Sequence, residues 1–173
     1  MNLERRIRIL EKRLLEAKEP NTELLDKYVD GTYKINSDKT VDVTGNFKMI
    51  EGEANSVLDI AQFGKVTGNF DVRGIKLKSL EGSPSSVGGY YSIAFNPVTD
   101  LQYSPEKVGG NFDAQKCKLT SIKGISKEIG GTLHLEKNPT EFKVRDIMSM
   151  TKVEKNKVFV ESEDSKLDLI FSL

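Results

Sequence analysis

V-T-G-N-F at residues 66–70, V-G-G-Y-Y at 87–91, V-G-G-N-F at 108–112 and I-G-G-T-L at 129–133 are four versions of one string. Their starting positions, 66, 87, 108 and 129, are evenly spaced, and a further copy, V-T-G-N-F at 43–47, precedes them at nearly the same spacing. One string recurring at a constant spacing indicates an internal repeat. The chain is therefore expected to be a stack of similar units.

Aligning the copies places apolar residues in four columns. These are Phe70, Tyr91, Phe112 and Leu133; Val72, Ile93, Ala114 and Leu135; Leu77, Val98 and Leu119; and Leu80, Leu101 and Ile122. The first two columns alternate with polar residues, which predicts a β-strand with one buried face. No segment between the strands is long enough for a long helix. Each unit is therefore expected to be one short strand and an irregular return, with coils about 4.8 Å apart.

The repeat matches the leucine-rich-repeat pattern L-x-L-x-x-N/C-x-L. Asn96, Cys117 and Asn138 occupy its N/C column, where a buried side chain bonds the backbone of neighbouring coils, whereas Ile75 cannot do so. The expected fold class is α+β, a short leucine-rich-repeat-like parallel β-solenoid with repeats of about 21 residues. A three-sided β-helix is the competing solenoid, and it ranks lower because only one strand pattern per unit is clear.

Both ends of a solenoid need caps. Alternating residues at 32–36 and 40–43 predict a β-hairpin cap, and a short helix within 139–150 followed by a strand at 158–160 predicts a helix–strand cap. The expected organisation is an N-terminal helical segment at 1–30, the solenoid with its caps at 31–160 and a C-terminal tail at 161–173. A second short helix is expected from Thr22 to Val29.

The N-terminal helix carries an apolar seam with heptad spacing, formed by Leu3, Ile7, Leu10 and Leu14. The seam spans fewer than three heptads, which is short for a coiled coil. Self-association through the seam and docking, on the chain's own solenoid or on a partner, both stay open. The tail ends in apolar residues and suits an added edge strand or a peptide offered to a partner.

Composition excludes several classes of protein. Twenty-six basic residues balance 26 acidic ones, which gives no general attraction to nucleic acid or to an anionic membrane. The sequence has no apolar run of the roughly 20 residues that span a bilayer, and its first residues do not resemble a secretory signal. The single cysteine excludes an internal disulfide and a cysteine-based zinc site, which fits a reducing cytoplasm.

The sequence resembles the leucine-rich-repeat-like proteins encoded by large tailed bacteriophages, whose repeats read approximately V-G-G-x-F-x-C-x-x-N-x-L-T-S-L-x-G-A-P. The matching strings here include V-T-G-N-F-D at 66–71, L-K-S-L-E-G-S-P at 77–84 and L-T-S-I-K-G at 119–124. The hairpin, the closing segment and the leading helix are similar as well, so the resemblance covers nearly all of the chain before its tail. The resemblance implies the fold and a phage origin, with the bacterial host cytoplasm or the virion as location, but no reaction.

The outward strand positions of a curved solenoid are its natural binding surface. We call this surface the strand face, and its candidate binding residues are Asp71, Arg73, Tyr90, Ser92, Asp113, Gln115, His134 and Glu136. Ser92, Asp113 and His134 share one column, but Ser92 and His134 lie two coils apart, about 9.6 Å, which is too far for a nucleophile and its base. His134 is expected to be an exposed strand residue that can pair with Asp113.

No other motif points to catalysis. Cys117 is expected to be a buried structural residue. Asp71, Asp113 and Glu136 lack the closely spaced oxygen ligands of a cation loop, so no metal is expected. No cofactor is expected, because no phosphate-binding motif opens a helix.

The sequence thus favours a non-enzymatic protein-interaction module of phage origin, a structural or accessory component that attaches to other virion proteins through its N-terminal helix. The alternative is an intracellular effector that binds and blocks a host protein through the strand face. A hydrolase is the weakest alternative.

Overall fold

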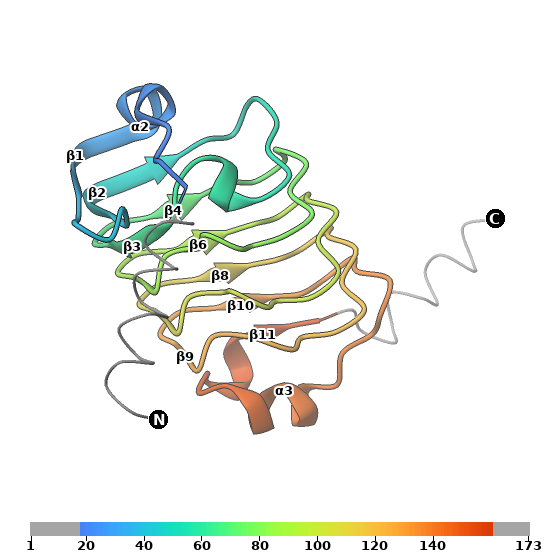
Figure 1. Ribbon diagram of the computed structural model, residues 1–173. Coiled ribbons are helices and arrows are strands. Elements are labelled where there is room, and N and C mark those ends of the chain that lie inside the picture. The colour runs from blue at the N-terminus through green and yellow to red at the C-terminus, as the bar shows by residue number, and fades with distance from the viewer. Residues whose placement is uncertain (1–17, 161–173) are drawn as a thin grey trace, which may run out of the picture.

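A computed structural model describes residues 18–160, which wind into a stack of flattened coils (Figure 1). Within these residues, eleven strands form one sheet in which the β1–β2 pair is antiparallel and the other pairs are parallel. A mostly parallel sheet with few helices agrees with the predicted α+β, solenoid-like architecture. The seam residues Leu3, Ile7, Leu10 and Leu14 and the tail at 161–173 lie outside the described residues.

The predicted strands form the first of two parallel ladders. Its members are β4 (Phe70–Asp71), β6 (Tyr91–Ser92), β8 (Phe112–Asp113), β10 (Leu133–His134) and β11 (Val158–Phe159). Phe70 pairs with Tyr91, Tyr91 with Phe112, and Phe112 with Leu133, so each residue pairs with its counterpart in the next copy of the string. The side chains of one column therefore lie directly above one another.

A second parallel ladder was not expected from the sequence. It consists of β3 (Phe63–Val66), β5 (Ser86–Val87), β7 (Lys107–Val108) and β9 (Glu128–Ile129). The repeated coils thus have two short strands separated by one or two glycines, and the expectation of one strand per unit is wrong. The glycines are needed because the coils approach closely at this corner: a side chain at Gly109 would overlap the carbonyl oxygen of Gly88 in the coil before it.

The N-terminal end of the stack is a helix followed by a hairpin. Helix α2 (Thr22–Tyr28) begins at Asn21, whose side chain accepts a hydrogen bond from the Leu24 amide at 3.1 Å. Strand β1 (Val29–Ile35) then pairs antiparallel with β2 (Val41–Lys48), so the hairpin is longer than predicted. Strand β2 lies between β3 and β4 in the sheet and therefore joins the two ladders.

The C-terminal end of the stack carries helix α3 (Val144–Met150), which is shorter than the predicted 139–150 segment. Pro139 and the residues after it are not helical, and Lys143 is the N-cap in extended conformation. Short 3-10 helices lie at Val57–Asp59 (η1) and Lys155–Lys157 (η2). Strand β11 follows η2 and pairs with β10.

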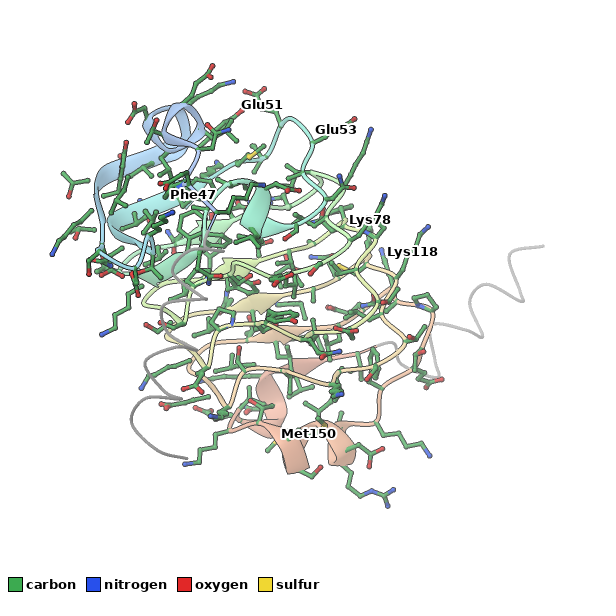
Figure 2. All side chains as sticks on the ribbon, viewed as in Figure 1. Phe47, Glu51, Glu53, Lys78, Lys118 and Met150 are labelled. Atoms are coloured by element: carbon green, nitrogen blue, oxygen red, sulfur yellow. The ribbon has the colours of Figure 1, made fainter. Side chains whose placement is uncertain are left out.

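The core is filled by the predicted columns, with an aromatic stack at its centre. The ring centroids of Phe47 and Phe70 are 5.3 Å apart, those of Phe70 and Tyr91 are 5.7 Å apart, and those of Tyr91 and Phe112 are 5.1 Å apart. Figure 2 labels Phe47, which lies in strand β2 of the hairpin, where the column begins. All four rings are fully buried, and aromatic pairs at such distances add stabilisation beyond their buried area.

The N/C column supplies polar bonds inside this core, as predicted. The buried Asn96 side chain donates to the Val72 and Ile93 carbonyls at 2.8 and 2.9 Å and accepts from the Leu77 amide at 3.0 Å. Asn138, two coils further along the chain, makes the same three kinds of bond. Both side chains tie the backbones of adjacent coils together.

Left-handed backbone recurs at two corners of the coils. One corner column holds Gly74, Phe95, Lys116 and Lys137, with φ of 72°, 61°, 52° and 58°; the other holds Gly82, Tyr103 and Gly124, with φ of 96°, 69° and 89°. Left-handed backbone costs a non-glycine residue about 1–2 kcal/mol. Phe95 and Tyr103 nevertheless occupy two of these positions, and their side chains are exposed.

Candidate functional site

The structure brings the candidate residues of the strand face into register. Asp71 pairs with Ser92, Ser92 with Asp113, and Asp113 with His134, so the predicted column exists as a row of adjacent strand positions. Within single strands, residues two apart also meet on the same face. The strand face is therefore organised both across the coils and along each strand.

Asp71, Arg73 and Tyr90 form one cluster on the strand face. The Arg73 guanidinium donates from Nε to Asp71 Oδ1 at 3.0 Å and from Nη2 to Asp71 Oδ2 at 2.5 Å, and the Tyr90 hydroxyl donates to Oδ2 at 3.1 Å. Asp71 is fully buried beneath these side chains, so it is not the exposed residue that the sequence suggested. Its burial is possible because a bidentate guanidinium neutralises the carboxylate.

The ionisation of this cluster follows from its contacts. Hydrogen bonds to Asp71 raise the pKa of the Arg73 guanidinium, so it stays charged. Burial, and then the negative charge of Asp71, raise the pKa of the Tyr90 phenol above its ordinary value. Tyr90 is thus a neutral hydrogen-bond donor at physiological pH, and the Asp71–Arg73 pair has no net charge.

Ser92, Asp113 and Gln115 form a second, looser cluster on the neighbouring coils. The Ser92 hydroxyl donates to Asp113 Oδ2 at 3.4 Å, and the Gln115 side-chain amide donates to the same oxygen at 3.4 Å. The Gln115 backbone amide donates to Oδ1 at 3.1 Å. No cation among residues 18–160 forms an ion pair with Asp113. Ser92 is buried, again contrary to its predicted exposure, because neighbouring side chains cover its short hydroxymethyl group.

His134 pairs along its own strand and not with Asp113. Its Nδ1 lies 3.0 Å from Glu136 Oε1, and its Nε2 lies 3.1 Å from Thr132 Oγ1. The imidazole stacks on the ring of Phe159 in β11, with centroids 4.7 Å apart. The expected pairing with Asp113 is therefore replaced by the Glu136 contact, because residues two apart on a strand lie on the same face.

A hollow of about 250 Å³ opens between these clusters, and its lining residues are Arg73, Tyr90, Ser92, Asn111, Asp113, Gln115 and His134. Six of the eight predicted binding residues line it. Asp71 lies beneath Arg73 and Tyr90, and Glu136 stands beside His134 outside the lining. We call this feature the strand-face hollow.

Asn111 completes the hollow and was not among the predicted binding residues. Its Oδ1 accepts a hydrogen bond from the Thr132 amide at 2.9 Å, as Asn69 accepts from Tyr90 and Asn46 from Asn69. The asparagine in the repeated string is the sequence feature that could have revealed this row. It fixes the spacing of the coils that carry the hollow.

Within residues 18–160, Ser92 and His134 are not placed as a nucleophile and its histidine base. Ser92 bonds to Asp113, whereas both ring nitrogens of His134 bond to residues of its own coil, so no hydrogen bond links the serine to the histidine in the described part of the chain. Burial raises the pKa of the Cys117 thiol to about 11, and this thiol donates to the Ile93 carbonyl at 3.3 Å. No group of three potential metal ligands is found within residues 18–160.

Comparison with known protein families, with curated proteins and with solved structures finds no significant match to this chain. None of the helices between residues 18 and 160 is both long and apolar enough to cross a membrane.

Proposed function

We propose that this chain is a non-enzymatic protein-interaction module built on a leucine-rich-repeat-like solenoid. In this proposal the unit is about 21 residues long, within the range of leucine-rich repeats. The β1–β2 hairpin caps one end, and α3 with β11 caps the other. The register of the first ladder and the two end structures support it. The similarity of the repeats to those of tailed-phage proteins supports a phage origin, with action in the host cytoplasm or in the virion.

The observation that carries the function is the strand-face hollow. It is concave, lies on the outer side of a stacked sheet and presents a guanidinium, a carboxylate, two amides and a phenol. Solenoids use such a surface to hold extended partners. A polar, open hollow with no serine–histidine link suits recognition better than turnover.

The seam of the N-terminal helix is a second contact surface in this proposal, supported by its heptad spacing alone. Attachment through Leu3, Ile7, Leu10 and Leu14 fits a structural or accessory component of a phage particle. Contact through the strand-face hollow fits an effector that binds and blocks a host protein. The geometry of the hollow favours the strand face as the main contact.

Two variants of the full chain separate these surfaces. Gln115→Trp places an indole in the strand-face hollow, and Lys118→Trp, on the outer edge of the stack (Figure 2), is its matched control. Ile7→Asp with Leu10→Asp disrupts the seam. Each tagged chain is used to capture proteins from infected or producing cells, the captured protein is identified by mass spectrometry, and its binding is then measured with purified components.

We expect Gln115→Trp to abolish binding of the identified partner and Lys118→Trp to leave it unchanged. Loss of binding only in the seam variant would instead assign attachment to the N-terminal helix. Hydrolysis of a substrate that disappears in His134→Ala would overturn the non-enzymatic proposal.

A further inference from the structure

The charged groups around the strand-face hollow are unevenly paired. Within the lining, Asp113 is the carboxylate and Arg73 the permanent cation, while Asp71 lies beneath Arg73 and Glu136 lies beside His134. Arg73 is already committed to Asp71 through two nitrogens. Glu136 Oε1 contacts the His134 ring, and its buried Oε2 has no hydrogen-bond partner. Because Arg73 is paired with Asp71, Asp113 is left in the lining without a cation of residues 18–160 against it.

The carboxylate of Asp113, which lines this hollow, accepts only weak hydrogen bonds from the groups around it. Two of its three hydrogen bonds are 3.4 Å long, close to the limit of a useful bond, and the third is 3.1 Å. A charge-assisted bond to a carboxylate is normally about 2.7–2.9 Å and about twice as strong as a neutral one. Asp113 thus retains capacity for a strong cationic donor.

Other lining residues offer partners for the parts of a guanidinium that Asp113 would not contact. The Gln115 side-chain amide, which donates through its nitrogen to Asp113, keeps a carbonyl oxygen that can accept one of the outer N–H groups, and Tyr90 adds an aromatic residue to the lining. Guanidinium groups combine bidentate bonds to carboxylate with stacking on aromatic rings, whereas an ammonium acts as a compact point charge. The set of groups therefore favours arginine over lysine.

The positive charge of Arg73 repels a guanidinium bound in the hollow only weakly. Its guanidinium lines the hollow, but it is turned toward Asp71 on its own coil. Its charge is also cancelled by the bidentate contact with the buried Asp71.

We propose that the strand-face hollow receives an arginine side chain of a protein partner, with Asp113 as its counter-ion. This inference rests on the proposed function, because it names the chemistry of the partner that the strand face would bind.

The first test uses the full chain and the peptide acetyl-Gly-Arg-Gly-amide as the probe, followed by amide NMR shifts. The matched peptide carries citrulline, which has the shape of arginine without its charge. We expect saturable shifts at Ser92, Asn111, Asp113 and Gln115 with the arginine peptide at millimolar concentration and none with the citrulline peptide. Equal shifts with both peptides, no shifts with either, or shifts confined to another surface would overturn the inference.

Variants sharpen this test. Asp113→Asn keeps the shape of the side chain and removes its charge, so it should weaken the arginine peptide about tenfold, the lower range for losing a hydrogen bond to a charged group. Asp100→Asn, on the irregular return of a coil, is the control and should have no effect. Gln115→Lys places an ammonium of the chain itself in the hollow and should also weaken the peptide. Unchanged affinity in both hollow variants would contradict the proposal.

The partner identified with the capture experiment separates this inference from the proposed function. If Gln115→Trp and Asp113→Asn both abolish binding, both proposals are supported. If Gln115→Trp abolishes binding and Asp113→Asn does not, the strand face binds its partner without an arginine contact and the inference fails alone. If neither variant reduces binding, the strand face is not the contact surface, and the inference fails together with the assignment of the main contact to the strand face.

Discussion

Asn96→Ala tests whether the N/C column holds adjacent coils together. The substitution removes three hydrogen bonds at 2.8, 2.9 and 3.0 Å, to Val72, Ile93 and Leu77, from a side chain that is 2% exposed. Each intramolecular hydrogen bond contributes about 1 kcal/mol net. The alanine also leaves backbone groups unpaired in a region that water does not reach. We therefore expect Asn96→Ala to lower the free energy of unfolding by about 3 kcal/mol.

The assay is urea denaturation at neutral pH, followed by circular dichroism and by tyrosine fluorescence. Asn138→Ala is the matched control, because Asn138 makes the same three kinds of bond from a partly exposed position. Water can replace some of its bonds, so this variant should lose about half as much, about 1.5 kcal/mol. A loss below about 1 kcal/mol for Asn96→Ala, or equal losses for the two variants, would refute the reasoning.

Three further predictions concern single residues of the coils. Tyr103→Gly relieves left-handed backbone and should stabilise the chain by about 0.5–1 kcal/mol in urea denaturation, whereas Gly124→Ala, in the same column, should destabilise it. Burial raises the pKa of the Tyr91 phenol, so the unfolded chain releases this proton first above about pH 10 and stability falls there. The stability advantage over Tyr91→Phe should therefore shrink as the pH rises from about 9 to 11, and a constant difference would contradict this account. The Cys117 thiol, with its pKa raised to about 11, should react with an aromatic disulfide at about pH 8 far more slowly in the native chain than in urea, and similar rates would show that it is accessible.

The interior of the fold could be predicted because its information is periodic. The constant spacing of the repeated string aligns Phe70, Tyr91 and Phe112, and alternation within each strand assigns the buried face. The bonds of Asn96 could be anticipated from its place in the same frame. Both features depend on position along the chain, which the sequence displays directly.

The second ladder could not be predicted, because its strands in most coils have two residues and contain no alternation to recognise. The left-handed backbone at Phe95 and Tyr103 could not be predicted from the sequence either. Bulky residues disfavour that conformation, so local preference argues against it, and the stacking of neighbouring coils overrides the preference.

The strand face was predicted at the level of positions but not of contacts. The register placed Ser92, Asp113 and His134 in one row, yet His134 contacts Glu136 two residues along its own strand. Likewise, Arg73 folds over Asp71 and buries it. The neighbour to which a long polar side chain bonds depends on its rotamer, and a sequence pattern does not specify the rotamer.

Strand β2 is hydrogen-bonded to the first strand of each ladder, and this gives the chain a direction of assembly. Once the hairpin has closed, it offers an edge for both halves of the next coil, and every later coil docks on a surface that already exists. A ribosome adding roughly 5–20 residues per second delivers about one coil every 1–4 seconds. The molecule can thus be completed turn by turn during translation, because every strand after β1 has a pairing partner that precedes it in the chain.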